Sequence, residues 1–209
     1  MSKSKGLFIT FEGTEGSGKS TQIKRAVQFL KNRGHRVLIL REPGGTRISE
    51  SVRKVILNKK FREMTQETEL LLYLACRAQI LREKILPALS KGVVVICDRF
   101  EDSTLAYQGY GRGIPLAKIR EVSRLFVRGN LRPDLIFLLD MDPVEGMKRG
   151  GRNDRIEKES IRFHQRVRRG YLAMAKKERN RYVVLKASES KDALTKKIKE
   201  RLIDAVGKS

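Results

Sequence analysis

The glycine-rich segment GTEGSGKS, residues 13–20, has the residue types and spacing needed to hold a chain of phosphates. It fits the pattern of Gly, four residues, Gly-Lys and then Ser or Thr that is typical of phosphate-binding loops. Glycines let backbone N–H groups turn inward around an anion, Lys19 would reach the β- and γ-phosphates, and the Ser20 hydroxyl could ligate Mg²⁺. A helix that begins here would also direct the positive end of its dipole at the phosphates. The sequence therefore predicts an ATP- or GTP-binding loop formed by Gly13, Thr14, Glu15, Gly16, Ser17, Gly18, Lys19, Ser20 and Thr21.

A second candidate for metal chemistry follows the apolar run Val93–Cys97, which ends in Asp98 and Arg99. In proteins with such a glycine loop, a carboxylate at the end of a neighbouring strand lies beside the Mg²⁺ ion. We therefore predict that Asp98 and Ser20 share the metal; the alternative is an Asp that only caps the loop after a core strand. Asp140 has a similar position but no adjacent Arg, and we interpret it as structural.

These residues need a scaffold, and strand and helix patterns alternate along the chain. Apolar runs that suit buried strands lie at residues 6–11, 37–40, 93–97, 135–139 and 182–185. Helical patterns lie at residues 19–33, 48–57, 65–90, 114–129 and 157–177, and at the C-terminus with Leu194, Ile198, Leu202 and Val206 on one face. We predict a single α/β domain over residues 1–209, a phosphate-loop fold with a five-stranded parallel sheet and helices on both faces. Ligands are expected at the carboxyl ends of the strands.

The composition narrows the class of protein. Of the 209 residues 40% are hydrophobic and 33% charged, and no apolar run is long enough to cross a bilayer. Residues 1–5 lead straight into a strand-like run, which leaves no room for a signal peptide. Cys76 and Cys97 are interpreted as core residues, and His35 and His164 show no partner pattern that suggests catalysis. We expect a reduced, cytoplasmic protein without a membrane partner.

The charge is strongly positive, with 46 Lys and Arg against 24 Asp and Glu and a net charge of +22. Such an excess suits nucleic-acid binding, because Lys and Arg neutralise phosphates. However, the basic residues are spread along the chain and interleaved with acids, and no RNA-recognition or zinc-finger pattern accompanies them. A basic enzyme would also attract nucleotides, which are polyanions. Nucleic acid is therefore not the partner that we favour.

Several blocks of sequence, in a fixed order from Phe8 to Leu185, resemble the thymidylate kinase family. They are FEG at 11–13, REPGGT at 41–46, DRF at 98–100 with Ser103 and AYQ at 106–108, and DRIE at 154–157. The resemblance implies a nucleoside monophosphate kinase that phosphorylates dTMP to dTDP with ATP and Mg²⁺, by direct in-line transfer, in dTTP synthesis. It also implies a homodimer packed through helices.

The same resemblance assigns roles to residues that match the family's motifs. Arg99 resembles the arginine that binds the dTMP phosphate, Arg53 a second arginine near it, and Glu15 the acid that accepts the sugar 3′-hydroxyl. Tyr107 resembles the ring beneath the deoxyribose. The residues that would face thymine are Tyr73, Arg77, Thr104 and Gln108. Tyr73 stands where the family commonly has Phe, and a simple core aromatic is its alternative interpretation.

A basic segment at about residues 149–156, RGGRNDRI, resembles the mobile lid of the family. Some members place an arginine in the glycine loop, where this chain has Gly16, so a lid arginine would have to supply that cation. We predict Arg149, Arg152 and Arg155 as catalytic residues together with Lys19 and Asp98. Arg155 matches the family best and Arg149 least. A basic surface loop is the alternative.

Two other functions stay open. A deoxynucleoside kinase would also carry a glycine loop and an Asp-Arg pair, but it would accept a sugar hydroxyl with the help of a carboxylate base. An ATP-dependent nucleic-acid-binding protein is the second alternative. In the favoured reaction no general base is needed, because the dTMP phosphate is already deprotonated enough to attack.

Overall fold

The computed structural model describes residues 6–149 and 154–207 of the chain. Their five strands form one sheet with the order β2-β3-β1-β4-β5, and every neighbouring pair is parallel. The strands are β1 (Phe8–Glu12), β2 (Val37–Arg41), β3 (Val94–Asp98), β4 (Leu135–Asp140) and β5 (Tyr182–Lys186). The predicted parallel sheet is confirmed, and each strand lies close to the apolar run that predicted it.

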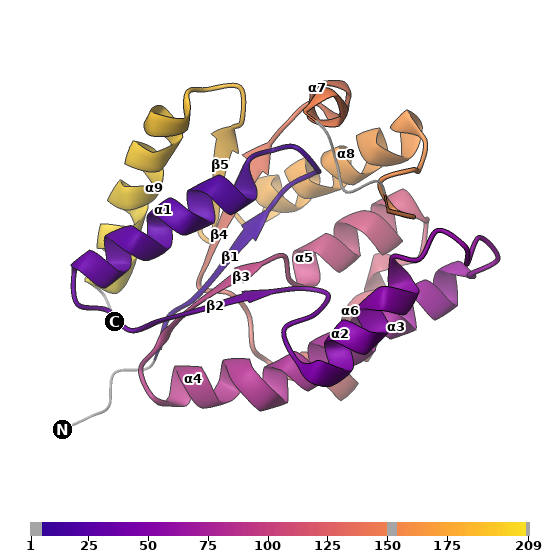
Figure 1. Ribbon diagram of the computed structural model, residues 1–209, viewed down its shortest axis with the longest axis horizontal. Helices are drawn as coiled ribbons and strands as arrows, with labels where there is room; N and C mark the ends of the chain where they lie inside the picture. The colour runs from indigo at the N-terminus through magenta and orange to yellow at the C-terminus, as the bar shows by residue number, and fades with distance from the viewer. Residues whose placement is uncertain (1–5, 150–153, 208–209) are drawn as a thin grey trace.

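Two helices cover one face of the sheet. They are α1 (Lys19–Asn32) and α9 (Lys191–Val206), which lie next to each other in Figure 1. Ile23 and Leu30 of α1 and Ile198 of α9 pack with Phe11 and Phe137 of the sheet in one buried cluster. The helix that follows the glycine loop is therefore fixed to the sheet along its apolar face.

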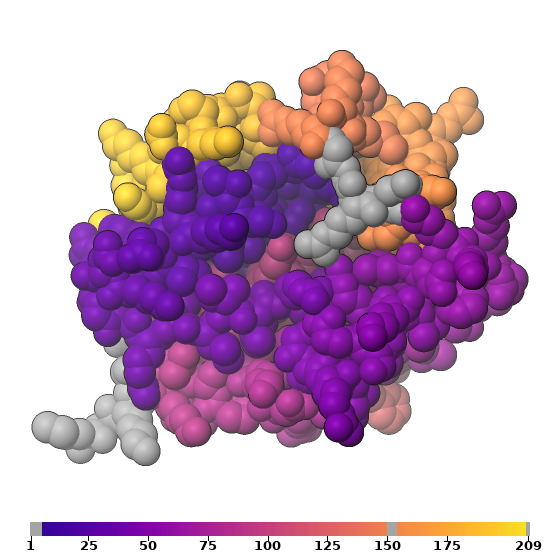
Figure 2. Space-filling view, in the orientation of Figure 1, coloured from indigo at the N-terminus to yellow at the C-terminus, as the bar shows by residue number. Residues whose placement is uncertain are grey.

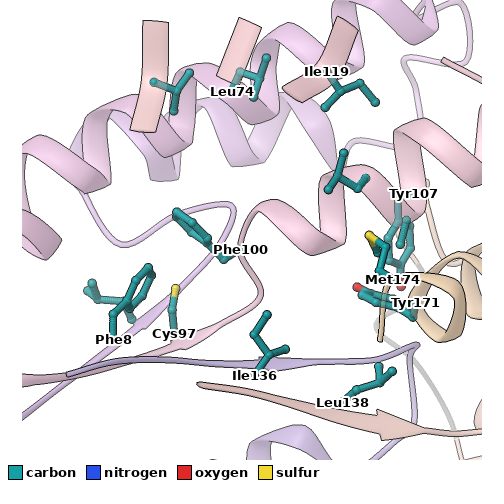
Figure 3. Close-up of a cluster of buried hydrophobic side chains, with 14 of the residues drawn as sticks. Phe8, Leu74, Cys97, Phe100, Tyr107, Ile119, Ile136, Leu138, Tyr171 and Met174 are labelled. Atoms are coloured by element: carbon teal, nitrogen blue, oxygen red, sulfur yellow. The ribbon is translucent and has the colours of Figure 1, made fainter. Parts of the chain in front are cut away.

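The remaining helices lie mainly on the opposite face (Figure 1). In Figure 3, Phe8 and Cys97 of the sheet and Phe100 face Leu74 and Ile119 across this second core. The segments are α2 (Arg47–Ile56), α3 (Gln66–Ile80), the π-helical η1 (Leu81–Ile85), α4 (Leu86–Ser90), α5 (Glu101–Thr104), η2 (Leu105–Gly111), α6 (Leu116–Val122), η3 (Ser123–Arg128), α7 (Pro143–Lys148) and α8 (Ile161–Lys177).

Three of the expected helices differ from the sequence-based expectation. The pattern at 114–129 forms α6 and η3 in succession. The pattern at 65–90 forms α3, η1 and α4 in succession rather than one regular helix. The helix expected at 157–177 begins at Ile161, because the Ser160 side chain accepts a hydrogen bond from the backbone N–H of Phe163 and caps it there.

The helical segment 101–111, formed by α5 and η2, was missed. Nearly all of its side chains are buried, so it shows no alternation of polar and apolar faces. It also carries two glycines, which normally weaken a helix. A Cβ on Gly111 would lie 2.6 Å from Phe163 Cε2, so this glycine permits the close packing of η2 against α8.

The loops after β1, β3 and β4 emerge at the same edge of the sheet. They begin with Gly13, Arg99 and Met141, respectively. The candidate residues of the sequence analysis are thus brought to the carboxyl ends of parallel strands, as expected. Within residues 6–149 and 154–207, no helix is both long enough and apolar enough to span a membrane.

Candidate active site

A cavity of about 550 Å³ opens at this edge of the sheet. Figure 2 shows the surface hollowed between the indigo segment that carries the glycine loop and α1 and the purple segment that carries α2 and α3. The glycine loop and the start of α1 line one part of the cavity, from Glu15 to Thr21. The residues after β3, together with side chains of α3 and η2, line the other part.

The glycine loop is folded as an anion-binding turn. Gly13, Gly16 and Gly18 have φ values of 133°, 70° and 89°, which residues with a side chain rarely adopt. Lys19 begins α1, and its Nζ donates to the carbonyl oxygens of Gly13 and Thr14 at 3.0 and 3.1 Å. Burial and then the nearby Arg99 charge lower the pKa of Lys19 to about 8. An anion in the loop would offset both effects and favour the charged ammonium.

Asp98 and Ser20 are suitably placed for a shared metal ion. Both line the cavity, and the Asp98 Oδ1 atom is buried without a hydrogen-bond partner among the described residues. Such an orphaned carboxylate oxygen fits a cation ligand. In the described part of the chain, no group of three or more His, Cys, Asp or Glu residues could hold a metal by itself. An ion here would therefore need oxygens from phosphate and water, which is how Mg²⁺ commonly binds.

Asp140, by contrast, is engaged in an ion pair. Both of its carboxylate oxygens accept from the Arg168 guanidinium, at 2.7 and 3.0 Å. The residue at the end of β4 thus fixes α8 to the sheet, in agreement with its structural interpretation.

Arg99, which lines the cavity, is held in an unusual conformation. Its φ of 72° is the only positive value among the described residues other than glycine. Its Nη1 donates to the Gly13 carbonyl oxygen at 2.9 Å, and its Nη2 donates to Glu15 Oε1 at 2.7 Å. The guanidinium also lies 5.0 Å from the centre of the Tyr107 ring. The arginine after β3 is thereby directed back at the glycine loop.

Glu15 links this arginine to the ring predicted to lie beneath the sugar. The Tyr107 hydroxyl donates to the Glu15 carboxylate at 2.7 Å. Burial raises the pKa of Glu15, but the charges of Arg99 and Lys19 and the Tyr107 hydrogen bond outweigh it, so the net pKa is lowered. Buried His164 lies close by, with Nδ1 3.8 Å from Glu15 Oε2. The Glu15 carboxylate is therefore an anionic hydrogen-bond acceptor at this end of the cavity.

The side chains predicted to face the base all contribute to the cavity lining. Tyr73, Arg77, Thr104 and Gln108 all line the cavity. Arg77 Nε donates to Glu42 Oε2 at 2.7 Å, and Nη2 donates to the Phe100 carbonyl oxygen at 2.9 Å. Arg77 Nη1 and Thr104 Oγ1 are buried and have no hydrogen-bond partner among the described residues. Unpaired polar atoms of this kind suit a ligand that has both donors and acceptors.

Arg53 also lines the cavity, and its Nη1 donates to the Pro43 carbonyl oxygen at 2.6 Å. This contact ties α2 to the REPGGT segment beside β2. The second predicted phosphate-binding arginine therefore faces the same cavity as Arg99.

The arginines of the predicted lid occupy different places. Arg149 lines the cavity, and its Nη1 is 3.4 Å from the Gly16 carbonyl oxygen. Arg155 is not among the residues that line the cavity. It forms an ion pair with Glu69 of α3, and its Nε donates to the Ile56 carbonyl oxygen at 3.0 Å. Arg152 lies outside the described residues, as does the rest of 150–153. Arg149, which matches the family least, thus contacts the glycine loop, whereas Arg155, which matches it best, does not.

Comparison with known proteins identifies the family. The model of the family described as thymidylate kinase matches residues 11–198. A thymidylate kinase of Maridesulfovibrio salexigens is 45% identical over 210 residues, which cover 96% of each chain. One of Pelotomaculum thermopropionicum is 47% identical over 208 residues, again 96% of each chain. The crystal structure of thymidylate kinase from Ehrlichia chaffeensis superposes with a TM-score of 0.75 at 35% identity, over 97% of this chain and 99% of that one.

The chain belongs to the thymidylate kinase family. The predicted fold, the family resemblance and the enzyme class, a nucleoside monophosphate kinase of nucleotide biosynthesis, are thereby confirmed. The assignments of individual residues by thymidylate kinase resemblance stay predictions. Apart from Gly13, Thr14, Arg152 and Arg155, every residue so assigned lines the cavity.

The sequence analysis missed buried residues that lie behind the cavity. Glu12, the last residue of β1, is fully buried, and Tyr171 and His164 lie seven residues apart on α8. A carboxylate at the end of a mostly apolar strand was a visible signal for Glu12. The spacing of His164 and Tyr171 also places them on one helix face, a pattern that the many basic residues of α8 conceal.

Proposed function

We propose that this chain transfers the γ-phosphoryl group of ATP directly to dTMP and so forms dTDP, with Mg²⁺ as the metal. One observation carries the proposal: Lys19 Nζ and Arg99 Nη1 donate to the same atom, the Gly13 carbonyl oxygen, at 3.0 and 2.9 Å. Lys19 is the cation for the ATP phosphates and Arg99 the cation for the acceptor phosphate. Because both converge on one atom, the two phosphates would lie side by side.

On the donor side, the backbone N–H groups of the glycine loop and Lys19 bind the phosphates of ATP. Ser20 and Asp98 would hold Mg²⁺, and the buried Asp98 Oδ1, which has no hydrogen-bond partner among the described residues, supports this assignment. When bound, the ion would offset charge that develops on the transferred group.

On the acceptor side, Arg99 and Arg53 bind the dTMP phosphate, which suits the forked geometry of a guanidinium. The Glu15 carboxylate accepts hydrogen bonds from the 3′-hydroxyl of the sugar and from the Tyr107 hydroxyl, and the Tyr107 ring packs beneath the deoxyribose. Tyr73 stacks on thymine, Arg77 and Thr104 bind its polar edge, and Gln108 lies beside them. Arg77 Nη1 and Thr104 Oγ1, which have no hydrogen-bond partner within residues 6–149 and 154–207, support this arrangement, since thymine presents both carbonyl acceptors and an N–H donor.

A cation over the transferred phosphoryl group is still needed, and Arg149 is its best-placed source. A side chain on Gly16 is excluded, because its Cβ would lie 2.2 Å from the Gly146 carbonyl oxygen. The backbone of Gly146 in α7 therefore packs closely against Gly16 of the loop, and Arg149 follows α7 directly. Arg155 acts as a second lid arginine only after its ion pair with Glu69 opens, and Arg152 completes the predicted set.

We further propose that the protein is a homodimer. Leu71 of α3 and Leu125 and Phe126 of η3 are 60%, 55% and 78% exposed, and these two segments pack against each other. An apolar face of this kind fits a second copy of the same chain. The two free, buried cysteines are compatible with action in the cytoplasm.

A phosphoryl-acceptor assay tests the proposal. Purified protein with ATP and Mg²⁺ is offered dTMP, thymidine or other nucleoside monophosphates, and the diphosphate formed is measured. We expect turnover with dTMP and none with thymidine. Turnover confined to thymidine would favour a deoxynucleoside kinase. Tight binding of DNA or RNA at physiological salt without kinase activity would favour the nucleic-acid-binding alternative.

A further inference from the structure

The Glu12 side chain is the most buried carboxylate near the cavity, and none of the roles given above uses it. It ends β1, immediately before the glycine loop, and is 0% exposed. Its Oε1 accepts the backbone N–H of Phe100 at 2.8 Å. Its Oε2 accepts the Ser103 hydroxyl at 2.6 Å and the Tyr171 hydroxyl at 3.1 Å. One carboxylate thus joins β1, the turn after β3, α5 and α8.

Both hydroxyls on Glu12 also contact Arg99. Arg99 Nη1 lies 3.3 Å from Ser103 Oγ and 3.2 Å from the Tyr171 hydroxyl oxygen. The two hydroxyl oxygens lie 2.7 Å apart. Figure 3 shows Tyr171 beside Met174 and Tyr107 in the packed core, so the ring that carries this hydroxyl has neighbours that fix it.

The direction of these hydrogen bonds depends on a carboxylate at position 12. An ionised carboxylate only accepts, so the Ser103 proton points at Glu12, and the Tyr171 proton points at Glu12 or Ser103. In either case the hydroxyl lone pairs face the guanidinium of Arg99, which only donates. The Phe100 N–H is satisfied at the same time, and Phe100 is the residue that follows the left-handed Arg99.

We propose that Glu12 is a positioning residue for the acceptor phosphate: through Ser103, Tyr171 and the Phe100 backbone, its carboxylate holds Arg99 in the conformation that binds dTMP. The inference rests on the proposed role of Arg99 as the dTMP phosphate ligand. It adds a residue that never touches the substrate and acts only through Arg99.

The isosteric variant Glu12→Gln separates this role from packing. An amide has one acceptor oxygen and one donor nitrogen. If its oxygen accepts from Phe100, its NH₂ meets the Ser103 hydroxyl and reverses the bonds, so a hydroxyl proton points at Arg99. If its oxygen accepts from Ser103, the NH₂ meets the Phe100 N–H, and two donors face each other. Neither orientation satisfies the whole network.

The test measures dTMP binding by titration calorimetry at pH 8, where the Glu12 carboxyl is ionised, together with binding of a non-hydrolysable ATP analogue and steady-state kinetics. We expect Glu12→Gln to raise the Kd for dTMP about tenfold or more, in line with the loss of charge-assisted hydrogen bonds. The Kd for the ATP analogue should change much less. Unchanged dTMP affinity in a folded Glu12→Gln protein would overturn the inference.

Two further variants keep the test decisive. Tyr171→Phe removes one hydroxyl and keeps the ring, so it should weaken dTMP binding in the same direction and less than additively with Glu12→Gln. It also supplies the test if Glu12→Gln does not fold; unchanged dTMP affinity would then overturn the inference. Asp140→Asn is the matched control, because it also neutralises a carboxylate at a strand end and should leave dTMP affinity unchanged.

An Arg99→Lys variant distinguishes a failure of the inference from a failure of the proposed function. If Arg99→Lys weakens dTMP binding and Glu12→Gln does not, only the positioning role of Glu12 is wrong. If neither variant changes dTMP affinity, the assignment of Arg99 to the acceptor phosphate is wrong as well.

Discussion

Arg155 forms an ion pair with Glu69, in which Nη2 and Oε2 lie 2.6 Å apart. Both side chains are largely buried, at 11% and 1% exposure. Glu69 also accepts from Gln108 Nε2 at 2.8 Å, and Gln108 lines the cavity. The carboxylate therefore joins a residue on the base side of the cavity to Arg155 of the predicted lid.

The lid assignment predicts a kinetic signature for Arg155. If Arg155 leaves Glu69 to act on the transferred phosphoryl group, Arg155→Ala should lower kcat by about 100-fold, as for loss of one transition-state donor, with little change in dTMP affinity. Steady-state kinetics together with dTMP titration measures both quantities. An unchanged kcat would mean that Arg155 only braces α3 through Glu69, and it would leave Arg149 as the lid cation.

The contact between Gly16 and Gly146 makes a second prediction. Gly16→Ala should displace α7 and Arg149, because the new Cβ would meet the Gly146 carbonyl oxygen at 2.2 Å, and we expect kcat to fall about tenfold or more. Gly34→Ala is the matched control. It has a similar φ of 82° but no atom within 4 Å of the added Cβ. It should cost about 1 kcal/mol of unfolding free energy and leave kcat unchanged. Equal kcat values for the two variants would contradict the account of the loop.

The pH dependence of stability tests the environment of Glu12. Burial and then the Asp102 carboxylate raise the pKa of Glu12 from 4.5 to about 7, against the lowering effects of Ser103, Arg99 and the Phe100 N–H. The charged side chains of Lys19 and Arg77 also interact with Glu12. So does Tyr182, whose hydroxyl donates to Asp102. Because the folded pKa is above the unfolded one, the contribution of Glu12 to stability is full below pH 4.5 and is lost as the pH rises towards about 7.

Denaturant unfolding of the parent protein and of Glu12→Gln between pH 5 and pH 8 measures this contribution. Compared with the parent protein, Glu12→Gln should have a lower free energy of unfolding at pH 5, and this difference should shrink or reverse at pH 8. Its dTMP affinity should nevertheless be reduced at pH 8. An identical pH dependence in the two proteins would show that Glu12 does not titrate in this range. Asp102→Asn distinguishes the neighbouring carboxylate from Glu12 as the source of the effect.

The proposed homodimer predicts a specific sensitivity of η3. Phe126→Glu should convert the protein to monomers at micromolar concentration, since it places a charge on the apolar face at its most exposed side chain. Sedimentation velocity measures the change. Ile203→Glu, on exposed α9 at the opposite side of the sheet, is the control and should leave the mass unchanged. A monomeric parent protein would contradict the proposed dimer.

Much of the fold could be predicted from local sequence. The five strands are mostly apolar runs, because the central strands β1, β3 and β4 are buried on both faces of a parallel sheet. The helices of the first face keep a clear apolar stripe. The segment 101–111 could not be found in this way, because it is buried on all sides and has no stripe. Its fold depends on contacts with α8, which is distant in the sequence.

In the candidate site, too, the features set by local sequence could be predicted and those set by long-range contacts could not. The glycine loop and Asp98 follow from short motifs whose geometry is local. The hydrogen bonds of Glu12 to Phe100 and Tyr171 span 88 and 159 positions, so no short sequence motif predicts them. The ion pair of Arg155 with Glu69 likewise depends on how residues 154–157 pack on α3, which the DRIE motif alone does not reveal.

Binding of a two-headed nucleotide tests most directly whether two phosphate sites meet at Gly13. In such an analogue, adenosine and thymidine are joined 5′ to 5′ through a chain of phosphates. We predict one molecule bound per chain, more tightly than either ATP or dTMP and displaced by both, with affinity weakened by Lys19→Ala and by Arg99→Ala alike. Displacement by only one of the two nucleotides, or an affinity that depends on only one of these cations, would contradict direct transfer between adjacent phosphates.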